Sequence, residues 1–461
     1  MISSLFIISC LSESEPTTVS VSETTSPKRP DILLVVLDTT RADALQSYGN
    51  TRPVGENFAK LANMGTLFTQ AWASSSWTWP SHASLFTGLY PWEHGAHFAP
   101  PSASIALKPD PLYASEPDPS IPMLAERLKD LGYDTVAFSA NRLIGPDFVL
   151  SKGFATTEFL DDDSKVVTKV QAYLQNRKSD KPLFLFLNFM SAHTPWFYNN
   201  EPWVVKHQES LKPETAPDWM RPHILPKGIG LHPFYPHFTE SLVYHYISGK
   251  KDIPDSGKTI IRDLYDAEVR RSDLHLGQVL SMWNVDESVI AVTSDHGEYL
   301  GEHRLLEHGR TLYPEVLHVP LVWKSSSRAQ GVVKDPIPMH FVHDEILREV
   351  GLEAPNSLFS PPESVFAGAW VDHYWAKDLK GRFTKGYRLQ RTGNNVYISD
   401  SEGNCEGFQL QSGSQRQNTD CPTEIHQHLQ SLFQQSKTGP SVKPNARTLE
   451  QLKKLGYVGN E

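Results

Sequence analysis

The sequence contains only three cysteines among its 461 residues, namely Cys10, Cys405 and Cys421. Three cysteines are too few for a disulfide-stapled scaffold or for a zinc site built from four thiolates. No apolar run approaches the ~18–20 residues that a membrane-spanning helix requires. A basic excess is also absent, because 43 Lys and Arg against 53 Asp and Glu leave a formal net charge of −10. Nucleic acid is therefore not an expected partner, since binding phosphates requires a basic face.

The remaining composition is that of an ordinary globular protein. Hydrophobic residues make up 39% of the chain and charged residues 21%, values far from those of disordered, collagenous or coiled-coil chains. A chain of this length can bury a full core without disulfide or metal staples. Composition therefore indicates a large globular protein of enzyme size, and it leaves the activity open.

The first 30 residues differ from the rest of the chain. The short apolar stretch Leu5–Ile8 leads into Ile8-Ser9-Cys10, which is similar to a bacterial lipobox, and a Ser-, Thr-, Glu- and Pro-rich tract follows. Such a tract is too poor in apolar residues to fold and would act as a flexible tether. We expect residues 1–30 to be a signal or lipoprotein-like segment, with Cys10 as a candidate lipid anchor and the cell envelope or periplasm as the location. The alternative is a disordered tail with a chance cysteine.

Apolar runs rich in β-branched or aromatic residues alternate with helical patterns along most of the chain. Such runs are typical of strands buried on both faces of a parallel sheet. The predicted strands are 31–37, 135–138, 183–189 and 288–293, and the predicted helices are 56–64, 121–131, 165–175 and 260–283. Their alternation predicts an α/β fold with a mainly parallel central sheet flanked by helices.

A small α+β subdomain is expected at the C-terminus. Strands are predicted within 374–398, and helices at 424–433 and 449–455. Cys405 and Cys421 flank a loop rich in Gly, Ser, Gln and Asn. They would pair in an oxidising compartment and remain free thiols in a reducing one, and the sequence leaves both alternatives open.

Polar residues follow three of the predicted strands at the point where each strand ends. The first strand runs into Asp38, the strand at 183–189 is followed by His193, and the strand at 288–293 runs into Asp295 and His296. Ligands of open α/β sheets bind outside the carboxyl ends of the strands. Carboxylates and imidazole suit a hard to borderline divalent cation such as Ca²⁺, Mn²⁺, Mg²⁺ or Zn²⁺. The strand ends therefore predict a metal site at one edge of the sheet.

The segment Ser76–Gly88 contains a hydroxyl group close to a predicted helix start. Pro80 suits the first turn of a helix, and Gly88 can end that helix. Thr78 is then expected just before the helix N-terminus, where backbone N–H groups and the helix dipole favour negative charge. A threonine at this position is either a simple helix cap or a nucleophile whose alkoxide the helix stabilises.

The motifs resemble those of the sulfatase family, within the alkaline phosphatase superfamily, from about Asp31 to the end of the chain. In the family signature a nucleophile precedes a Pro, a small residue, a basic residue and a helix ending in Thr-Gly. The matching residues here are Thr78, Pro80, Ser81, His82, Thr87 and Gly88. Further resemblances are the segments 37–43, 188–195, 265–268, 294–303, 312–321 and 452–459. The resemblance implies an alkaline phosphatase-like core and a single divalent metal ion, with Ca²⁺ or Mn²⁺ favoured, held by Asp38, Thr78, Asp295 and His296.

Several positions depart from the sulfatase pattern. A sulfatase has Cys or Ser at the nucleophile position, which is oxidised to formylglycine. Thr78 cannot yield that aldehyde, because its extra methyl group would give a ketone, so no formylglycine is expected. The sequence Ser139–Arg142 replaces a family segment that contains a lysine and a histidine, and His308 replaces a lysine thirteen residues after Asp295. The residues that handle sulfate are therefore largely replaced, whereas the metal ligands are kept.

A threonine nucleophile occurs in relatives that hydrolyse or transfer phosphoryl groups, including phosphodiesterases. The resemblance then implies that Thr78 attacks phosphorus or sulfur, with His193, His308 and His82 as candidate catalytic residues. Glu298, Glu302 and His303 are expected to face solvent or to support the ligands.

The expected substrate is a small-molecule, glycan or lipid head-group ester of sulfate or, on mechanistic grounds, of phosphate or phosphonate. The expected catalytic domain spans residues 31–362, with residues 196–256 as a lid-like insertion, and residues 363–461 form the C-terminal subdomain. The alternatives are an envelope transferase of phospho-head-groups and a non-catalytic relative that binds an anionic glycan.

Overall fold

The computed structural model describes residues 29–98, 114–197, 199–212, 214–224, 230–232, 241–371, 383–411 and 416–442, with Ala446 and Glu450. The predicted N-terminal segment with Cys10 therefore lies outside the described residues, as does most of the predicted helix at 449–455.

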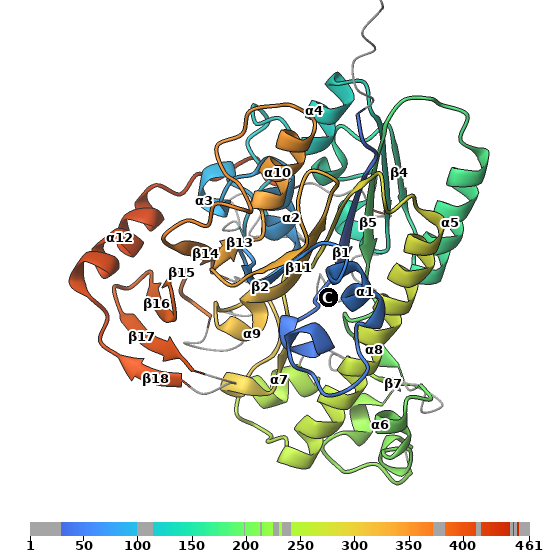
Figure 1. Ribbon diagram of the computed structural model, residues 1–461. Coiled ribbons are helices and arrows are strands. Elements are labelled where there is room, and N and C mark those ends of the chain that lie inside the picture. The colour runs from blue at the N-terminus through green and yellow to red at the C-terminus, as the bar shows by residue number, and fades with distance from the viewer. Residues whose placement is uncertain are drawn as a thin grey trace, which may run out of the picture.

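A nine-stranded sheet forms the central layer of the molecule (Figure 1). Its strands are β1 Ile32–Leu37, β2 Thr66–Trp72, β3 Asp134–Ser139, β4 Thr156–Phe159, β5 Leu183–Phe189, β8 Val289–Thr293, β11 His318–Lys324, β12 Gly331–Val333 and β13 Ile337–Pro338. The strand order is β12-β2-β11-β8-β1-β5-β3-β4, and β13 also pairs with β2. Strands β8, β1, β5, β3 and β4 are parallel, whereas β11 runs antiparallel to both of its neighbours.

The central strands β1 and β5 are buried along their whole length. This burial on both faces explains why their sequences are continuous apolar runs without alternation. The strand order brings Asp38 and the residues after β8 to the same edge of the sheet, because β1 lies between β5 and β8 and runs parallel to both. The predicted α/β fold with a mainly parallel sheet is confirmed.

Helices cover both faces of this sheet. In Figure 1, α1 Glu56–Ala62, α5 Asp163–Asn176 and α8 Asp255–Met282 lie on one face, and α2 Thr78–Thr87, α4 Leu124–Asp130 and α10 Phe341–Glu349 lie on the other. The predicted helix at 260–283 begins five residues earlier, since Pro254 precedes its first turn. Within the part of the chain that the structure describes, no helix combines the length and apolar character needed to cross a bilayer.

The region predicted to be a lid carries only short elements among its described residues. These are β6 Trp196–Phe197, α6 Pro202–Val205, β7 Gly230–Leu231, α7 Leu242–Ile247 and the 3-10 helices η5 Glu209–Leu211 and η6 Arg221–His223. Burial and then the nearby His193 lower the pKa of His232 to about 4, which places the end of β7 close to the His193 segment.

A second sheet follows the main domain. It is antiparallel and consists of β14 Val365–Ala369, β15 Tyr387–Thr392, β16 Asn395–Asp400, β17 Cys405–Leu410 and β18 Arg416–Thr419. Helix α12 Thr423–Gln434 packs on β15 and β16. A disulfide joins Cys405 and Cys421, whose Cα atoms are 6.0 Å apart. Of the two alternatives that the sequence left open, paired cysteines and free thiols, the structure has the paired one.

An ion pair links the second sheet to the main domain. Arg416 Nη2 in β18 lies 2.6 and 2.7 Å from the two carboxylate oxygens of Glu315. Glu315 is the second residue of the short helix α9 Pro314–Leu317. Burial opposes ionisation of Glu315, but the His303 hydrogen bond and the Arg416 charge outweigh it and lower its pKa to about 2. The carbonyl oxygen of Glu315 lies against Gly297, where a Cβ would approach within 2.3 Å. The second sheet therefore supports the loop that follows His296.

Replacing Arg416 by methionine is expected to lower the free energy of unfolding at pH 7 by roughly 1–3 kcal/mol, because it leaves a mostly buried carboxylate without its main cation. The pKa of Glu315 is depressed in the folded state, so this stabilisation is present above the usual pKa near 4.5 and is lost as the pH falls toward 2. Urea unfolding at pH 7 and pH 3 tests this. Arg416→Lys should keep part of the effect, and an equal loss of stability at both pH values would contradict it.

Candidate functional site

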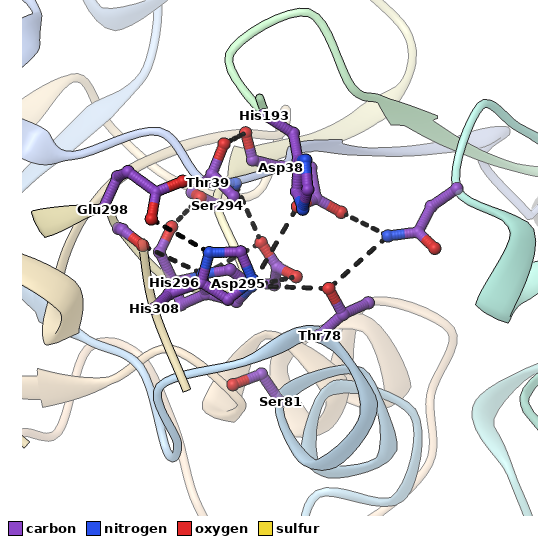
Figure 2. Close-up of polar contacts among 12 residues, drawn as sticks. Asp38, Thr39, Thr78, Ser81, His193, Ser294, Asp295, His296, Glu298 and His308 are labelled. Atoms are coloured by element: carbon purple, nitrogen blue, oxygen red, sulfur yellow. Dashed lines mark hydrogen bonds and ion pairs between the residues drawn. The ribbon is translucent and has the colours of Figure 1, made fainter. Parts of the chain in front are cut away.

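Four side chains from three separate segments meet at the edge of the central sheet. Asp38 follows β1, Asp295 and His296 follow β8, and Thr78 is the first residue of α2. All four are completely buried. Figure 2 shows Asp38, Asp295 and His296 gathered around one point, with Thr78 facing them from the helix below. One ligand atom each from Asp38, Asp295 and His296 lies within 4.8 Å of the others.

Asp38 has one oxygen fixed by the protein and one without a hydrogen bond. The side-chain amides of Asn141 and Asn188 donate to its Oδ2 over 2.8 and 3.1 Å. The other oxygen, Oδ1, is buried without a donor and lies 4.0 Å from His296 Nε2.

Asp295 repeats this arrangement from the other strand. Its Oδ1 accepts hydrogen bonds from the backbone N–H groups of Thr39 and His296 over 3.3 and 3.0 Å. Its Oδ2 has no hydrogen-bond partner and lies 3.3 Å from His296 Nε2. The His296 ring is oriented by its own Nδ1–H, which donates to the Gly297 carbonyl over 3.0 Å. This leaves Nε2 as the nitrogen that faces the two carboxylates.

This donor set fits a divalent cation. Two buried carboxylate oxygens without hydrogen-bond donors, one imidazole nitrogen and the Thr78 hydroxyl face a common centre, and hydrogen bonds to the opposite side of each ligand hold it in place. Burial and the neighbouring Asp295 charge raise the pKa of Asp38, because without a cation the two carboxylates repel each other. Members of the alkaline phosphatase superfamily generally use a divalent metal, and this cluster is the place where the chain could hold one.

Thr78 lies one residue further into the helix than predicted. Trp77 is the N-cap of α2 and Thr78 is the first helical residue. Pro80 still occupies the first turn, where its missing N–H removes none of the helix hydrogen bonds. The hydroxyl Oγ1 of Thr78 lies 3.4 Å from His296 Nε2 and 3.4 Å from Asn141 Nδ2. Gly88 ends the helix in the left-handed conformation with a φ of 72°, as the sequence predicts.

Two further histidines lie near His296. Rings of His296 and His308 have centroids 4.3 Å apart, and those of His193 and His308 are 5.1 Å apart. His193 Nδ1 donates to the Thr194 carbonyl over 2.8 Å. Burial and then the nearby His296 and His193 rings lower the pKa of His308 well below its usual value. The structure therefore brings both predicted histidines to the site.

His82 occupies a different position, behind the ligands. Its Nδ1 lies 3.1 Å from the Thr78 carbonyl and 3.3 Å from Asp295 Oδ2, and its Nε2 is 3.3 Å from Asn188 Nδ2. Burial opposes protonation of His82, but the adjacent Asp295 carboxylate outweighs it and raises the pKa. The ring is fully buried, and this placement suits a support for Asp295.

Three residues of the site are not among the predicted catalytic or metal-binding residues. Asn141 follows β3, and the strand-end rule that selected Asp38 would have selected it too if applied to the strand predicted at 135–138. Asn188 lies within β5 and has no such signal. Of the two alternatives expected for Glu298, the structure shows the supporting one, because Glu298 is completely buried and its Oε1 lies 3.0 Å from His308 Nδ1 (Figure 2).

The remaining expectations for this loop are partly met. Glu302 accepts a hydrogen bond from Arg41 over 2.7 Å, and Arg41 also donates to the Glu298 carbonyl. His303 stacks on Tyr313 with ring centroids 3.8 Å apart. Both residues are partly exposed and lie outside the ligand cluster.

Comparison with known proteins agrees with the motifs. The sulfatase family model matches residues 30–349. An ulvan-active sulfatase of Formosa agariphila is 24% identical over 68% of this chain and 51% of its own length. The multifunctional alkaline phosphatase superfamily protein PehA of Trinickia caryophylli is 27% identical over 77% of this chain and 80% of its own. The chain thus spans about half the length of the first of these relatives and most of the second.

Solved structures show the same fold. A phosphonate monoester hydrolase from Silicibacter pomeroyi superposes with a TM-score of 0.62 at 17% identity, covering 88% of this chain and 94% of its own. A sulfatase-like protein from Bacteroides thetaiotaomicron gives a TM-score of 0.63 at 15% identity, covering 92% and 96%. The family supports an ester hydrolase, as the motifs imply. Because the family model matches more than half of the residues of this chain, the chain belongs to the sulfatase family.

Proposed function

We propose that this protein is a metal-dependent ester hydrolase that uses Thr78 as its nucleophile and prefers phosphodiester or phosphonate esters to sulfate esters. The observation that carries the proposal is the position of the Thr78 hydroxyl. It lies 3.4 Å from His296 Nε2, beside the unsatisfied oxygens of Asp38 and Asp295, at the N-terminus of a helix. A simple cap would not require a cluster of buried carboxylates in front of it.

The residues have distinct tasks in this reaction. A divalent cation bound by Asp38, Asp295 and His296 would act as a Lewis acid that lowers the pKa of the Thr78 hydroxyl. The amide of Asn141, 3.4 Å from the same hydroxyl, can donate to a substrate oxygen as negative charge develops there. The N–H groups at the start of α2 favour that charge as well. His82 is a positioning residue that holds Asp295 and does not touch the substrate.

The covalent step balances without any further reactant. The Thr78 hydroxyl loses its proton to solvent and Oγ1 forms a bond to phosphorus while the bond to the leaving oxygen breaks, and His193 is the candidate that gives this oxygen a proton. Water then attacks the phosphorus of the threonine ester and the bond from phosphorus to Oγ1 breaks. Protons from the attacking water and from solvent restore the Thr78 hydroxyl and the His193 proton. An acceptor alcohol in place of water would give the transferase alternative.

The preference for phosphorus is supported by what surrounds Thr78. The formylglycine route is closed to a threonine, and the lysine that a sulfatase places thirteen residues after its second metal-binding aspartate is replaced by His308. Among relatives, the solved phosphonate monoester hydrolase shares the fold. Glycan and lipid head-group esters both remain within the proposed substrate class, and the lipid anchor at Cys10 stays a sequence-based prediction.

A panel of aryl esters tests this preference. The protein, loaded with Mn²⁺ or Ca²⁺, is assayed with matched p-nitrophenyl sulfate, phosphate monoester, phosphodiester and phosphonate. We expect kcat/KM for the phosphodiester or the phosphonate to exceed that for the sulfate by at least about tenfold, because the sulfate-binding side chains are replaced. Sulfate as the best substrate of the panel would contradict the proposal.

A further inference from the structure

A second group of ligand-type side chains, two of them buried and one partly buried, lies next to the Asp38, Asp295 and His296 cluster. Glu298, Glu307 and His308 each offer one ligand atom, and these atoms lie within 4.8 Å of one another. The short hairpin of β9 Tyr299–Leu300 and β10 Leu306–Glu307 brings them together. Because Glu307 pairs with Tyr299, the preceding Glu298 lies opposite the following His308.

The two carboxylates of this group lack hydrogen-bond donors on one side. Glu298 is 0% exposed and Glu307 is 2% exposed. One oxygen of Glu298 contacts His308 Nδ1, but its Oε2 and Oε1 of Glu307 are buried with no hydrogen-bond partner. Buried carboxylate oxygens of this kind are costly unless a proton or a cation satisfies them.

The surrounding groups offset only part of the negative charge of the pair, and at Glu307 the nearby His193 ring contributes more to this than Arg310 does. Glu298 and Glu307 repel each other, and Asp38 adds to the negative charge at Glu298. Arg310 is a nearby cation that acts on both carboxylates, and its Nη1 donates to the main-chain carbonyls of Leu306 and His308. Arg41 contributes more weakly at Glu298. The two buried carboxylates therefore keep enough uncompensated negative charge to bind a cation.

We propose that Glu298, Glu307 and His308 hold a second divalent cation, separate from the one assigned to Asp38, Asp295 and His296. Two carboxylate oxygens and one imidazole nitrogen suit Mn²⁺ or Zn²⁺, whereas Ca²⁺ requires six to eight oxygen ligands. The competing arrangement is a proton shared by the two carboxyl groups, with Glu298 merely orienting the His308 ring.

A cation in this place would have a clear consequence for the neighbouring site. The His308 ring lies beside that of His296, with centroids 4.3 Å apart. Positive charge would then stand close to the substrate oxygens at the position where His308 replaces a lysine. The metal ion would thus supply the positive charge that a lysine at position 308 would otherwise provide.

Metal counting on the full chain tests the proposal without any measurement of turnover. Chelator-treated protein is equilibrated with Mn²⁺, freed of unbound ion and analysed for bound manganese per chain. We expect about two equivalents for the unchanged protein and about one for Glu307→Gln, because binding needs deprotonated, correctly placed ligands. Asp38→Asn should also bind about one, since it impairs only the first cluster. Glu302→Gln, in the same hairpin but outside both clusters, is the matched control and should keep about two.

Electron paramagnetic resonance of the manganese-loaded protein gives an independent reading. Two neighbouring Mn²⁺ ions broaden each other's signal, and Glu307→Gln should restore the spectrum of an isolated ion. Binding of one equivalent by the unchanged protein, or loss of that same ion in both Asp38→Asn and Glu307→Gln, would overturn the proposal. The panel of aryl esters bears on the proposed hydrolysis, whereas the metal count of Glu307→Gln bears on the second cation, so failure of one can be told from failure of the other.

Discussion

Thr78→Ala should lower kcat/KM for the best ester substrate by at least about 10³-fold, while leaving the fold intact. The expected loss is large because alanine removes the only atom of this side chain that can form the covalent bond, and the other residues of a nucleophilic site contribute little without it. Steady-state kinetics, combined with circular dichroism and bound-metal analysis of the same preparation, measure the effect.

The matched control is Thr78→Ser, which keeps the hydroxyl and removes one methyl group. It should retain measurable turnover, because the oxygen still faces His296 Nε2 and the Asn141 amide. A phosphorylated Thr78 peptide, trapped by acid quench and identified by mass spectrometry, would support the covalent step directly. Thr78→Ala with undiminished turnover would show that Thr78 is only the first residue of α2.

The sequence was sufficient for the fold class because the central strands are buried on both faces. Continuous apolar runs such as 183–189 are typical of strands in a covered parallel sheet, and the residues that follow them are the predicted metal ligands. The position of Thr78 could be predicted to within one residue, since Pro80 and Gly88 mark the two ends of the helix.

What the sequence could not supply is the orientation of side chains within the site. Asn188 lies in the middle of an apolar strand, and only the register between β1 and β5 places it opposite Val36 and near Asp38. The sequence left two alternatives for Glu298, facing solvent or supporting the ligands, and only the pairing of β9 with β10 places it in the interior beside His308. Such placements depend on contacts between distant segments, which periodicity does not encode.

The second large effect concerns the metal itself. Chelation of the divalent cation, or the substitution Asp295→Asn, is expected to lower kcat/KM by at least about 10²–10³-fold, since the Thr78 hydroxyl then loses the Lewis acid that activates it. Asp295 is the more informative ligand to change because its Oδ1 holds two backbone N–H groups and only Oδ2 faces the centre. In Asp295→Asn the amide oxygen can still accept hydrogen bonds from the backbone N–H groups, but the amide has no negative charge with which to bind the cation.

The two treatments should differ in their reversibility, and this difference separates a metal role from a structural one. Activity of the chelated protein should return on addition of Mn²⁺ or Ca²⁺, and the melting temperature should rise with it, because a ligand that binds only the folded state stabilises that state. Asp295→Asn should need a much higher metal concentration for the same rise. Asp163→Asn is a suitable control, since Asp163 is a buried acid that holds the backbone N–H groups of Met190 and Ser191 and lies outside both ligand clusters. If exhaustive chelation left turnover unchanged, Asp38, Asp295 and His296 would have to be regarded as a structural charge cluster, and the activation of Thr78 would require another base.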